Sequence, residues 1–326
     1  MDDNDPSVRP RAQQTGRTEI SLTGIPKVAT ARERRESYRE NMATGFNALA
    51  ELYYTYWGEF FHLAVFEPGD DPADAAAAYQ RTHERYLQAI GGTAAGRILD
   101  VACGGGALTA WLADNTNAQV LGVDQSDRQL AHARRLLAGG RRPNLRFVQQ
   151  DVMRLAGLAE PPFDAAICLD AACYLPDRPA ALRAIATCLQ PGARLLLVDW
   201  CRADRITALQ RELILQPLCR YWAIPDLETA AGYRRSFQAA GFRIHRLEDL
   251  SDRVLPNWER GYQAALQALS EPIRLGRLLR LAADAVKHGP LAVQAAKDQF
   301  QVALLAKAAA ESGVLRYVSI LAERRE

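Results

Sequence analysis

The sequence predicts an α/β protein built on a doubly wound, mostly parallel β-sheet. Apolar runs of about five residues alternate with longer helical patterns over residues 97–199. Three of these runs lead into an acidic residue, and three consecutive glycines at positions 104–106 follow the first run. This order of strand, tight turn and helix is typical of parallel sheets whose two faces are covered by helices.

The composition narrows the class of protein. The chain has 326 residues and a net charge of +2, so it can bury a large core and has no strong overall attraction to nucleic acid. The six cysteines form no Cys-x-x-Cys pair, which favours reduced thiols and predicts neither a disulfide framework nor a metal site. No signal peptide and no run long enough to cross a membrane is evident, so we expect a cytoplasmic protein.

The first 90 residues divide into two parts. Residues 1–30 are polar and contain several Pro and Gly residues, so we expect a flexible arm. Residues 31–90 are predicted to form an N-terminal helical cap, with an aromatic stretch at 53–62, a turn at 67–72 and a last helix over 79–90.

The predicted core begins at residue 91. Residues 91–202 hold its first part, and residues 203–326 hold the last strands together with two helical insertions, at about 203–230 and 254–312. We expect these insertions to join the N-terminal helices in a cap over the substrate, because loop insertions commonly determine specificity. Helices are expected at 128–137 and 180–189, and strands are expected near 97–101, 119–124, 145–150, 164–169, 194–199, 242–247 and 315–321.

Acidic residues at the strand ends indicate a ligand site. Asp124 lies twenty residues after Gly104, at the tip of the second strand, where a carboxylate can accept a hydrogen bond from a ribose hydroxyl. Asp151 follows the third strand in the same way. Because parallel strands end at one edge of the sheet, and glycines with a helix N-terminus lie there too, a nucleotide-like ligand is expected at this edge.

The run Asp100-Val101-Ala102-Cys103-Gly104-Gly105-Gly106 resembles the first motif of the class I S-adenosylmethionine-dependent methyltransferases, with Ala102 at the first glycine position. The resemblance continues through Asp124, Asp151 and the segments 163–164 and 189–192, and it implies a Rossmann-like sheet of seven strands with the last one antiparallel. A dinucleotide-binding fold is the alternative, but its spacing requires a third glycine at position 109, which is Thr109.

The resemblance implies S-adenosyl-L-methionine as cofactor and no metal. The glycine turn, with Asp100, Ala102, Cys103, Gly104, Gly105 and Gly106, would pass under the methionine and ribose, and Asp124 with Gln125 would bind the ribose diol. Asp151 and the Val152 backbone would face the adenine, and the Leu169 carbonyl and Asp170 would lie near the methionine ammonium. A helix N-cap is the alternative role for each acid, above all for Asp151.

Two pairs of residues are candidates for catalysis. Asp170 and Tyr174 follow the fourth strand and could orient a nucleophile or accept a proton; the alternative is that one contacts only cofactor and the other only packs. Glu59 and His62 are three residues apart, so on a helix they would share a face and could act as base and orienter. A histidine in an aromatic segment is, however, more often a packed core residue.

The aromatic residues Tyr53, Trp57, Phe61 and Trp222 are candidates for binding substrate, with packing inside the cap as the commoner alternative. Segments 56–63, 66–69 and 221–229 are similar to tocopherol and sterol C-methyltransferases. This resemblance implies a lipophilic small molecule as substrate, such as an isoprenoid, sterol, quinol or other natural product, methylated at carbon; oxygen or nitrogen as acceptor is the alternative.

The sequence also allows other hypotheses about ligands, activity and oligomeric state. Arg274, Arg277 and Arg280 could bind a diphosphate or an anionic lipid surface, although such a stripe is more often a solvated helix face. A protein that binds cofactor without turnover is a further alternative, and the chain could form a homo-oligomer. A nucleic-acid substrate is not expected, because residues 169–172 lack an Asn-Pro-Pro-Tyr motif and no basic face is evident.

Overall fold

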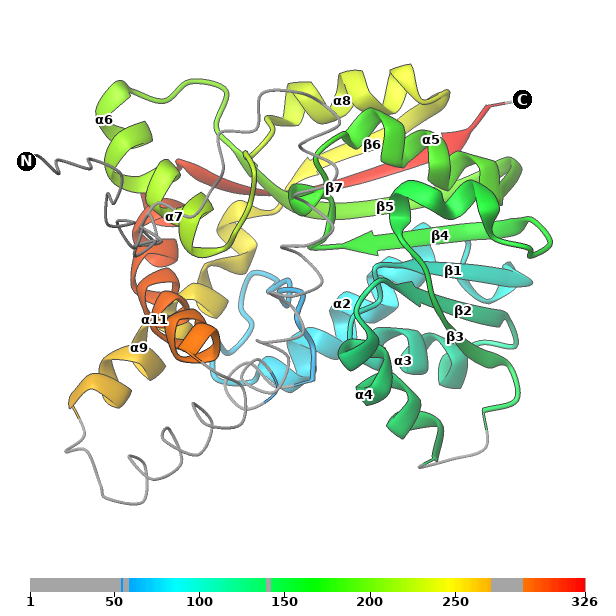
Figure 1. Ribbon diagram of the computed structural model, residues 1–326, viewed down its shortest axis with the longest axis horizontal. Helices are drawn as coiled ribbons and strands as arrows, with labels where there is room; N and C mark the ends of the chain where they lie inside the picture. Colours follow the sequence, from blue (N-terminus) through cyan, green and yellow to red (C-terminus); the bar gives the residue numbers. More distant parts are fainter. Residues whose placement is uncertain (1–53, 55–58, 139–141, 271–289, 326) are drawn as a thin grey trace, which may run out of the picture.

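Seven strands form one sheet in the order β3-β2-β1-β4-β5-β7-β6 (Figure 1). The computed structural model describes residue 54 and residues 59–138, 142–270 and 290–325. The strands are β1 (Arg97–Val101), β2 (Gln119–Asp124), β3 (Leu145–Gln149), β4 (Phe163–Leu169), β5 (Leu189–Arg202), β6 (Phe242–Asp249) and β7 (Leu315–Arg324). Strand β7 pairs antiparallel with β5 and β6, and the other pairs are parallel. The predicted fold class and strand count are confirmed.

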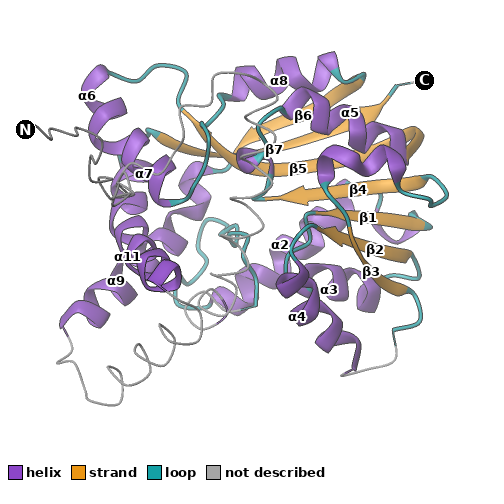
Figure 2. Cartoon of the chain, in the orientation of Figure 1, coloured by secondary structure: helices purple, strands orange, loops and turns teal. Residues whose placement is uncertain are grey.

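Helices cover both faces of the sheet, as Figure 2 shows. Side chains of α2 (Ala75–Ala89), α3 (Ala107–Asn115) and α4 (Asp127–Ala138) pack against one face. Those of α5 (Arg178–Cys188), α8 (Ala230–Ala239) and the 3₁₀ turn η2 (Val152–Gly157) pack against the other. The central strands are therefore apolar on both sides: Leu99, Val101 and Ile167 are completely buried.

The two insertions fold beyond the carboxyl ends of the parallel strands, at the left of Figure 1. The first contains α6 (Ala208–Gln210), a π-helical turn η4 (Arg211–Leu215) and α7 (Gln216–Tyr221). The second contains the turn η5 (Ser251–Val254) and the helices α9 (Leu255–Ser270) and α11 (Pro290–Glu311). Helix α11 contacts both α7 and α9, so the two insertions pack together. None of the described helices is long and apolar enough to cross a bilayer.

The N-terminal region differs from its prediction. Residues 59–73 form no regular helix, and α2 begins at Ala75, where the Asp74 carboxylate accepts a hydrogen bond from the Ala77 N–H at 3.0 Å. The expectation of helix is therefore wrong for 59–66, because the backbone of this segment bonds to distant side chains instead, whereas the turn expected at 67–72 is present. The Ala64 carbonyl, for example, accepts from the Asn257 amide at 2.8 Å. Residues 31–53 and 55–58, like the arm at 1–30, lie outside the described residues.

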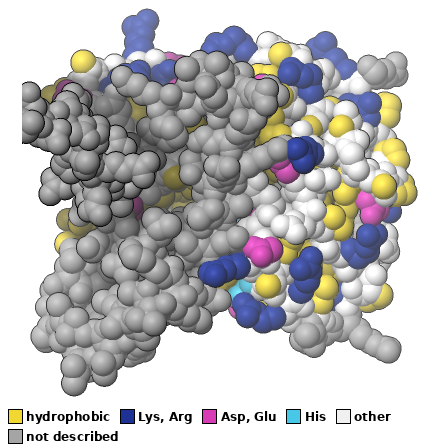
Figure 3. All heavy atoms as spheres, viewed as in Figure 1, with side chains coloured by type: hydrophobic (Ala, Val, Ile, Leu, Met, Phe, Trp, Pro, Cys, Tyr) yellow, Lys and Arg dark blue, Asp and Glu magenta, His cyan; other side chains and the backbone are white. Residues whose placement is uncertain are grey.

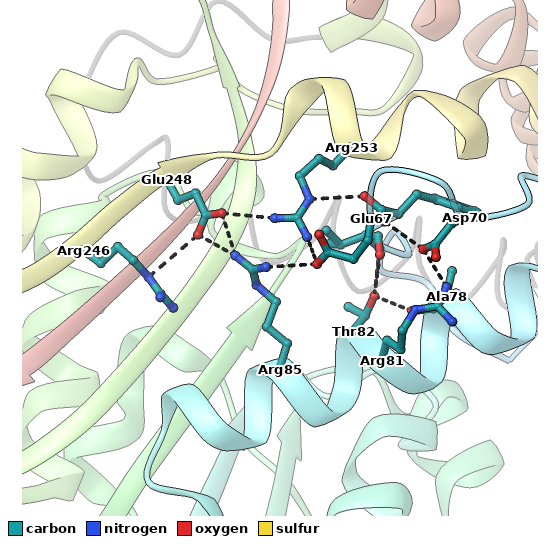
Figure 4. A network of polar contacts seen from close by, with 11 residues as sticks. Glu67, Asp70, Ala78, Arg81, Thr82, Arg85, Arg246, Glu248 and Arg253 are labelled. Carbon is teal, nitrogen blue, oxygen red and sulfur yellow. Dashed lines mark hydrogen bonds and ion pairs between the residues drawn. The ribbon is translucent and has the colours of Figure 1, made fainter.

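A network of ion pairs joins this segment to the last residues of the edge strand β6 (Figure 4). Arg85 of α2 donates to both carboxylate oxygens of Glu248 at 2.6 Å, and Arg253 donates to Glu248 at 3.2 Å. Arg253 also pairs with Glu67 and donates to the Phe66 carbonyl. The network joins α2, the segment before it and the β6–η5 corner, so it helps to hold the end of the segment 59–66 in place.

Candidate active site

A cavity opens at the carboxyl edge of the sheet, where β1, β2, β4 and β5 end. Its walls come from four sources: the glycine turn, the strand ends, the N-terminal segment and the insertions. The lining residues are Glu59, Phe60, Phe61, His62, Leu63, Asp100, Ala102, Cys103, Gly104, Gly105, Gly106, Ala107, Leu108, Asp124, Gln125, Gln129, Val152, Leu169, Asp170, Ala171, Tyr174, Leu175, Trp200, Trp222 and Trp258. Of the predicted cofactor-binding residues, all but Asp151 are among them.

The glycine turn has little room for side chains. Gly104 and Gly106 have φ of 54° and 75°, a left-handed conformation that glycine adopts without strain. A Cβ on Gly106 would meet the Phe147 ring at 2.5 Å, and one on Gly105 would meet the Tyr54 side chain. Ala102 has a φ of 57° although it carries a Cβ, so it occupies a glycine-like conformation at a cost of about 1 kcal/mol.

Asp100, at the end of β1, faces the cavity as a nearly buried carboxyl group. The Thr109 hydroxyl donates to it at 2.6 Å. Burial is the main cause that raises the pKa of Asp100 to about 7, and the nearby Asp124 adds to the rise. Thr109, whose identity argued against a dinucleotide turn, therefore has a local partner in the first helix after the turn.

Asp124, at the end of β2, is held by backbone groups. Its carboxylate accepts from the Gly104 N–H at 2.9 Å and from the Ser126 N–H at 2.8 Å. Burial nevertheless raises its pKa, because the desolvation of the anion outweighs these bonds. The glycine turn and the second strand are thus tied together through a single side chain at the place where a ribose was expected.

Asp151 takes the alternative role that the sequence allowed. Its carboxylate accepts from the Met153 N–H at 2.9 Å and so caps η2, and Asp151 does not line the cavity. Its neighbour Val152 does line it. Of the two residues expected near the adenine, Val152 therefore lines the cavity and Asp151 caps η2.

Asp170 is the most unusual residue of the site. Its φ is 49°, which is strained for a residue with a side chain, and both carboxylate oxygens are buried without a hydrogen-bond partner. Burial and the negative charge of Asp199 raise the pKa of Asp170 well above its usual range. A buried carboxyl group without partners, in the wall of a cavity, is a candidate proton acceptor.

Tyr174 lies near Asp170 on the short turn η3 (Ala172–Tyr174), and it also lines the cavity. Arg178, at the start of α5, donates to the carbonyls of Ala172 and Cys173 at 3.1 and 2.9 Å. The same guanidinium donates to the Asp226 carbonyl. The Arg178 side chain therefore holds the turn that carries Tyr174 in place.

Glu59 and His62 do not form the predicted helical pair, because the segment that carries them is not helical. His62 instead lies with its Nε2 at 3.0 Å from Nε2 of His83, and its Nδ1 is 3.3 Å from the Leu63 carbonyl. Burial lowers the pKa of His62 to about 4 and that of His83 to about 3, so both rings are neutral. With both ring nitrogens engaged inside the protein, His62 matches the alternative of a packed core histidine, and Glu59 is exposed.

Aromatic rings form a large part of the cavity lining. Trp222 and Phe61 line the cavity as residues of the predicted set, whereas Tyr53 and Trp57 lie outside the described residues, as do Arg274, Arg277 and Arg280. Sequence reasoning missed Trp200 and Trp258. Trp200 packs against both other tryptophans, with ring centroids 3.9 Å from Trp222 and 4.9 Å from Trp258. The position of Trp200 at the end of β5 could have identified it, but nothing near Trp258 in the sequence does so.

The charges on the surface are mixed. On the face drawn in Figure 3, Lys and Arg side chains of the described residues are interspersed with acidic and apolar ones. This part of the surface therefore offers no continuous basic track of the kind that binds nucleic acid.

Comparison with known proteins finds similarity to methyltransferases. Residues 98–192 match the family described as methyltransferase domain. Sterol 24-C-methyltransferase of Saccharomyces cerevisiae is 29% identical over 230 residues, which are 68% of this chain and 58% of that enzyme. Chloroplastic tocopherol O-methyltransferase of Arabidopsis thaliana is 23% identical over 263 residues, 74% of each chain. The crystal structure of the [4+2]-cyclase SpnF superposes with a TM-score of 0.70 at 20% identity, over 88% of this chain and 96% of that one.

Residues 98–192 thus match a methyltransferase domain, and the chain shares the fold of the superposed structure. The chain is similar to the sterol and tocopherol methyltransferases, and it spans less than two thirds of the length of the yeast enzyme.

The residues present fit S-adenosylmethionine, which carries positive charges at its sulfur and amino groups. The cavity presents three carboxyl groups, on Asp100, Asp124 and Asp170, and both oxygens of Asp170 are buried without a hydrogen-bond partner. Asp124 would hold the ribose diol, Val152 would pack on the adenine, and the Leu169 carbonyl would face the ammonium. The glycine turn borders the cavity on the side where the methionine part would lie.

Proposed function

We propose that this protein is a methyltransferase that methylates a lipophilic acceptor, of the isoprenoid or sterol kind, at a carbon atom. The observation that carries the proposal is the pairing, in one cavity, of an unpartnered carboxyl group with a wall of three tryptophans. Methylation of a carbon–carbon double bond creates a cation and then requires loss of a proton. Aromatic faces stabilise such a cation, and a buried carboxylate can take the proton.

The acceptor side of the cavity supports a lipophilic substrate. Trp222 and Trp258 belong to the two insertions, and both are less than a tenth exposed. Together with Trp200 they would enclose an apolar chain or ring system and exclude water from the reacting carbon. The relative from yeast is named for methylating a sterol at carbon, which agrees with an acceptor of this chemistry.

The steps that this chain performs follow from its side chains. S-adenosylmethionine, when bound, supplies a methyl group already activated for in-line displacement. Asp124 and the glycine turn fix the position of the cofactor, and the tryptophan wall orients the acceptor toward it. Asp170 then accepts the proton at a carboxylate oxygen, which its raised pKa favours. Tyr174, on the adjacent turn, would orient the acceptor beside Asp170.

A second candidate is transfer of the methyl group to a hydroxyl or amine of a natural product. The observation in its favour is the relative that is named a tocopherol O-methyltransferase, which matches more of this chain than the sterol enzyme does. An oxygen acceptor would use the same base, since Asp170 could remove the hydroxyl proton. Binding of cofactor without turnover is the third alternative.

Two measurements test the proposal. Calorimetry with S-adenosylmethionine should show saturable binding, and its absence would rule out all three alternatives. Incubation with cofactor labelled at the methyl group and a panel of sterols, isoprenoid alcohols and diphosphates, and quinols should give a labelled product. NMR of that product locates the label: a new carbon–carbon bond supports the first proposal, a methyl ether or methylamine supports the second, and no cofactor consumption supports the third.

A further inference from the structure

We infer that Asp199, which does not line the cavity, is a positioning residue that acts through Asp170: its negative charge makes the carboxyl group at the end of the neighbouring strand a stronger proton acceptor. The inference rests on the proposed role of Asp170 as the base and concerns how that base is tuned.

The two carboxyl groups lie on neighbouring parallel strands at the same edge of the sheet. In the register of β4 with β5, Leu169 faces Val198. The Asp170 N–H donates to the Val198 carbonyl at 2.9 Å, so Asp199 is the next residue along the partner strand. Asp199 is completely buried, and so are both carboxylate oxygens of Asp170. With little water around either group, their charges interact more strongly than charges at the surface.

Hydrogen-bond donors around Asp199 partly offset the effect of burial on its anion. The Tyr233 hydroxyl of α8 donates to Oδ2 at 2.6 Å, and the Trp200 N–H donates to Oδ1 at 2.8 Å. Arg178 of α5 and the Cys173 thiol of η3 lower the pKa of Asp199 further, so that burial raises it only to about 6. The acid behind the cavity therefore has donors from three elements.

The surroundings of Asp170 do not favour its anion to the same extent. Burial raises its pKa, the Asp199 charge raises it further, and the donors that oppose this rise make no regular hydrogen bond with it. The titratable and polar groups that face Asp170 come from every element around it: the Leu63 N–H, Tyr79 and Tyr86 of α2, Cys168 of β4, Cys173 of η3, Asp199 and Trp200 of β5, and Tyr317 of β7.

Two interacting carboxyl groups in such different environments lose their protons in order, Asp199 first and Asp170 second. Asp170 consequently holds its proton more firmly than an isolated aspartate does. Its conjugate base removes a proton from the methylated acceptor more readily for the same reason. Asp199, which does not contact the acceptor, thus increases the basicity of Asp170, which does.

The first test reads the carboxyl groups directly and needs no turnover. In protein labelled with ¹³C at the aspartate carboxyl carbons, the Asp170 signal is assigned by its loss in Asp170→Asn and the Asp199 signal by its loss in Asp199→Asn. We expect Asp170 to titrate at higher pH than Asp199. Titration of Asp170 at the same or lower pH would overturn the inference. Because this experiment uses the resting protein, its failure is distinct from a failure to find any methylated acceptor.

The second test uses the pH profile of kcat/KM. Replacement Asp199→Asn keeps the size of the side chain and removes the charge, so the acidic limb should move down by about 1 pH unit and the plateau should fall several-fold. The matched control, Asp204→Asn, removes a charge from an exposed position just beyond the end of β5 and should leave the limb in place. An Asp199→Asn protein with an unshifted limb would overturn the inference, and one that does not fold leaves the decision to the wild-type titration.

Discussion

The two walls of the cavity are built in opposite ways. On the cofactor side, the glycine turn and Asp124 belong to segments 20 residues apart, and the carboxylate is bonded to backbone N–H groups at 2.9 and 2.8 Å. On the acceptor side, Asp170, Trp200 and Trp258 come from three distant parts of the chain, and the carboxyl group of Asp170 has no hydrogen-bond partner. The first wall is ready to hold a ligand, whereas the second keeps its polar group free to react.

The largest effect is expected on the acceptor side. Asp170→Asn removes the proton acceptor and keeps the shape of the side chain, so kcat should fall about 100- to 10,000-fold. Cofactor affinity should fall less than it does in Asp124→Asn. Single-turnover kinetics and calorimetry on the same samples check both statements. A variant that retains near-normal kcat would show that Asp170 is not the proton acceptor.

A smaller effect is expected on the cofactor side. Asp124→Asn removes the charged acceptor for the ribose diol and weakens the bonds to Gly104 and Ser126, so the Kd for S-adenosylmethionine should rise about 10- to 100-fold. Calorimetry measures it. The control Asp114→Asn changes an exposed acid that pairs with Arg142 and should leave the Kd unchanged. Equal Kd values for both variants would remove Asp124 from the site.

The affinity for cofactor should also depend on pH. Asp100 has a raised pKa of about 7 in the free protein, so below pH 7 it carries a proton there. A cationic ligand favours the anion, and binding therefore releases this proton and is weaker at low pH. Between pH 6 and 8 the affinity should rise by up to about tenfold. Calorimetry in buffers of different ionisation enthalpy detects the proton, and Asp100→Asn should abolish its release.

The tryptophan wall offers a more graded test. Trp258→Phe keeps an aromatic face but reduces its area, so the KM for the acceptor should rise about fivefold with little change in cofactor affinity. Trp111→Phe is the control, because Trp111 lies on α3 outside the cavity lining. Steady-state kinetics with varied acceptor distinguishes the two. An unchanged KM in Trp258→Phe would place the acceptor elsewhere.

The smallest effect concerns the network that helps to hold the end of the segment 59–66 in place. Glu248→Gln weakens its bonds to Arg85 and Arg253, and we expect a loss of about 1 kcal/mol in the free energy of unfolding. Denaturant titration measures that loss. Glu160→Gln, which breaks pairs with Arg97 and Arg146 at another place, is the control. Only Glu248→Gln should also raise the acceptor KM, because only that network adjoins the segment lining the cavity.

What could be predicted from the sequence follows the same division. The strands, the glycine turn and Asp124 were predicted because each depends on residues close together along the chain, such as the run that ends at Asp100. His62 was placed beside Glu59 because helical spacing was the only local guide, but its partner His83 is 21 residues away. Trp258 and Tyr317 reach the Asp170 region only through tertiary packing, which no local pattern reports.

The backbone of Asp170 has a consequence for the evolution of the protein. Its φ of 49° is one that glycine adopts freely, so replacement by glycine would relieve strain in the folded state while removing the proposed proton acceptor. Selection for thermal stability alone would thus erode turnover at this position. In a variant selected for stability, residue 170 should be checked first, because the substitution that stabilises the fold there also removes activity.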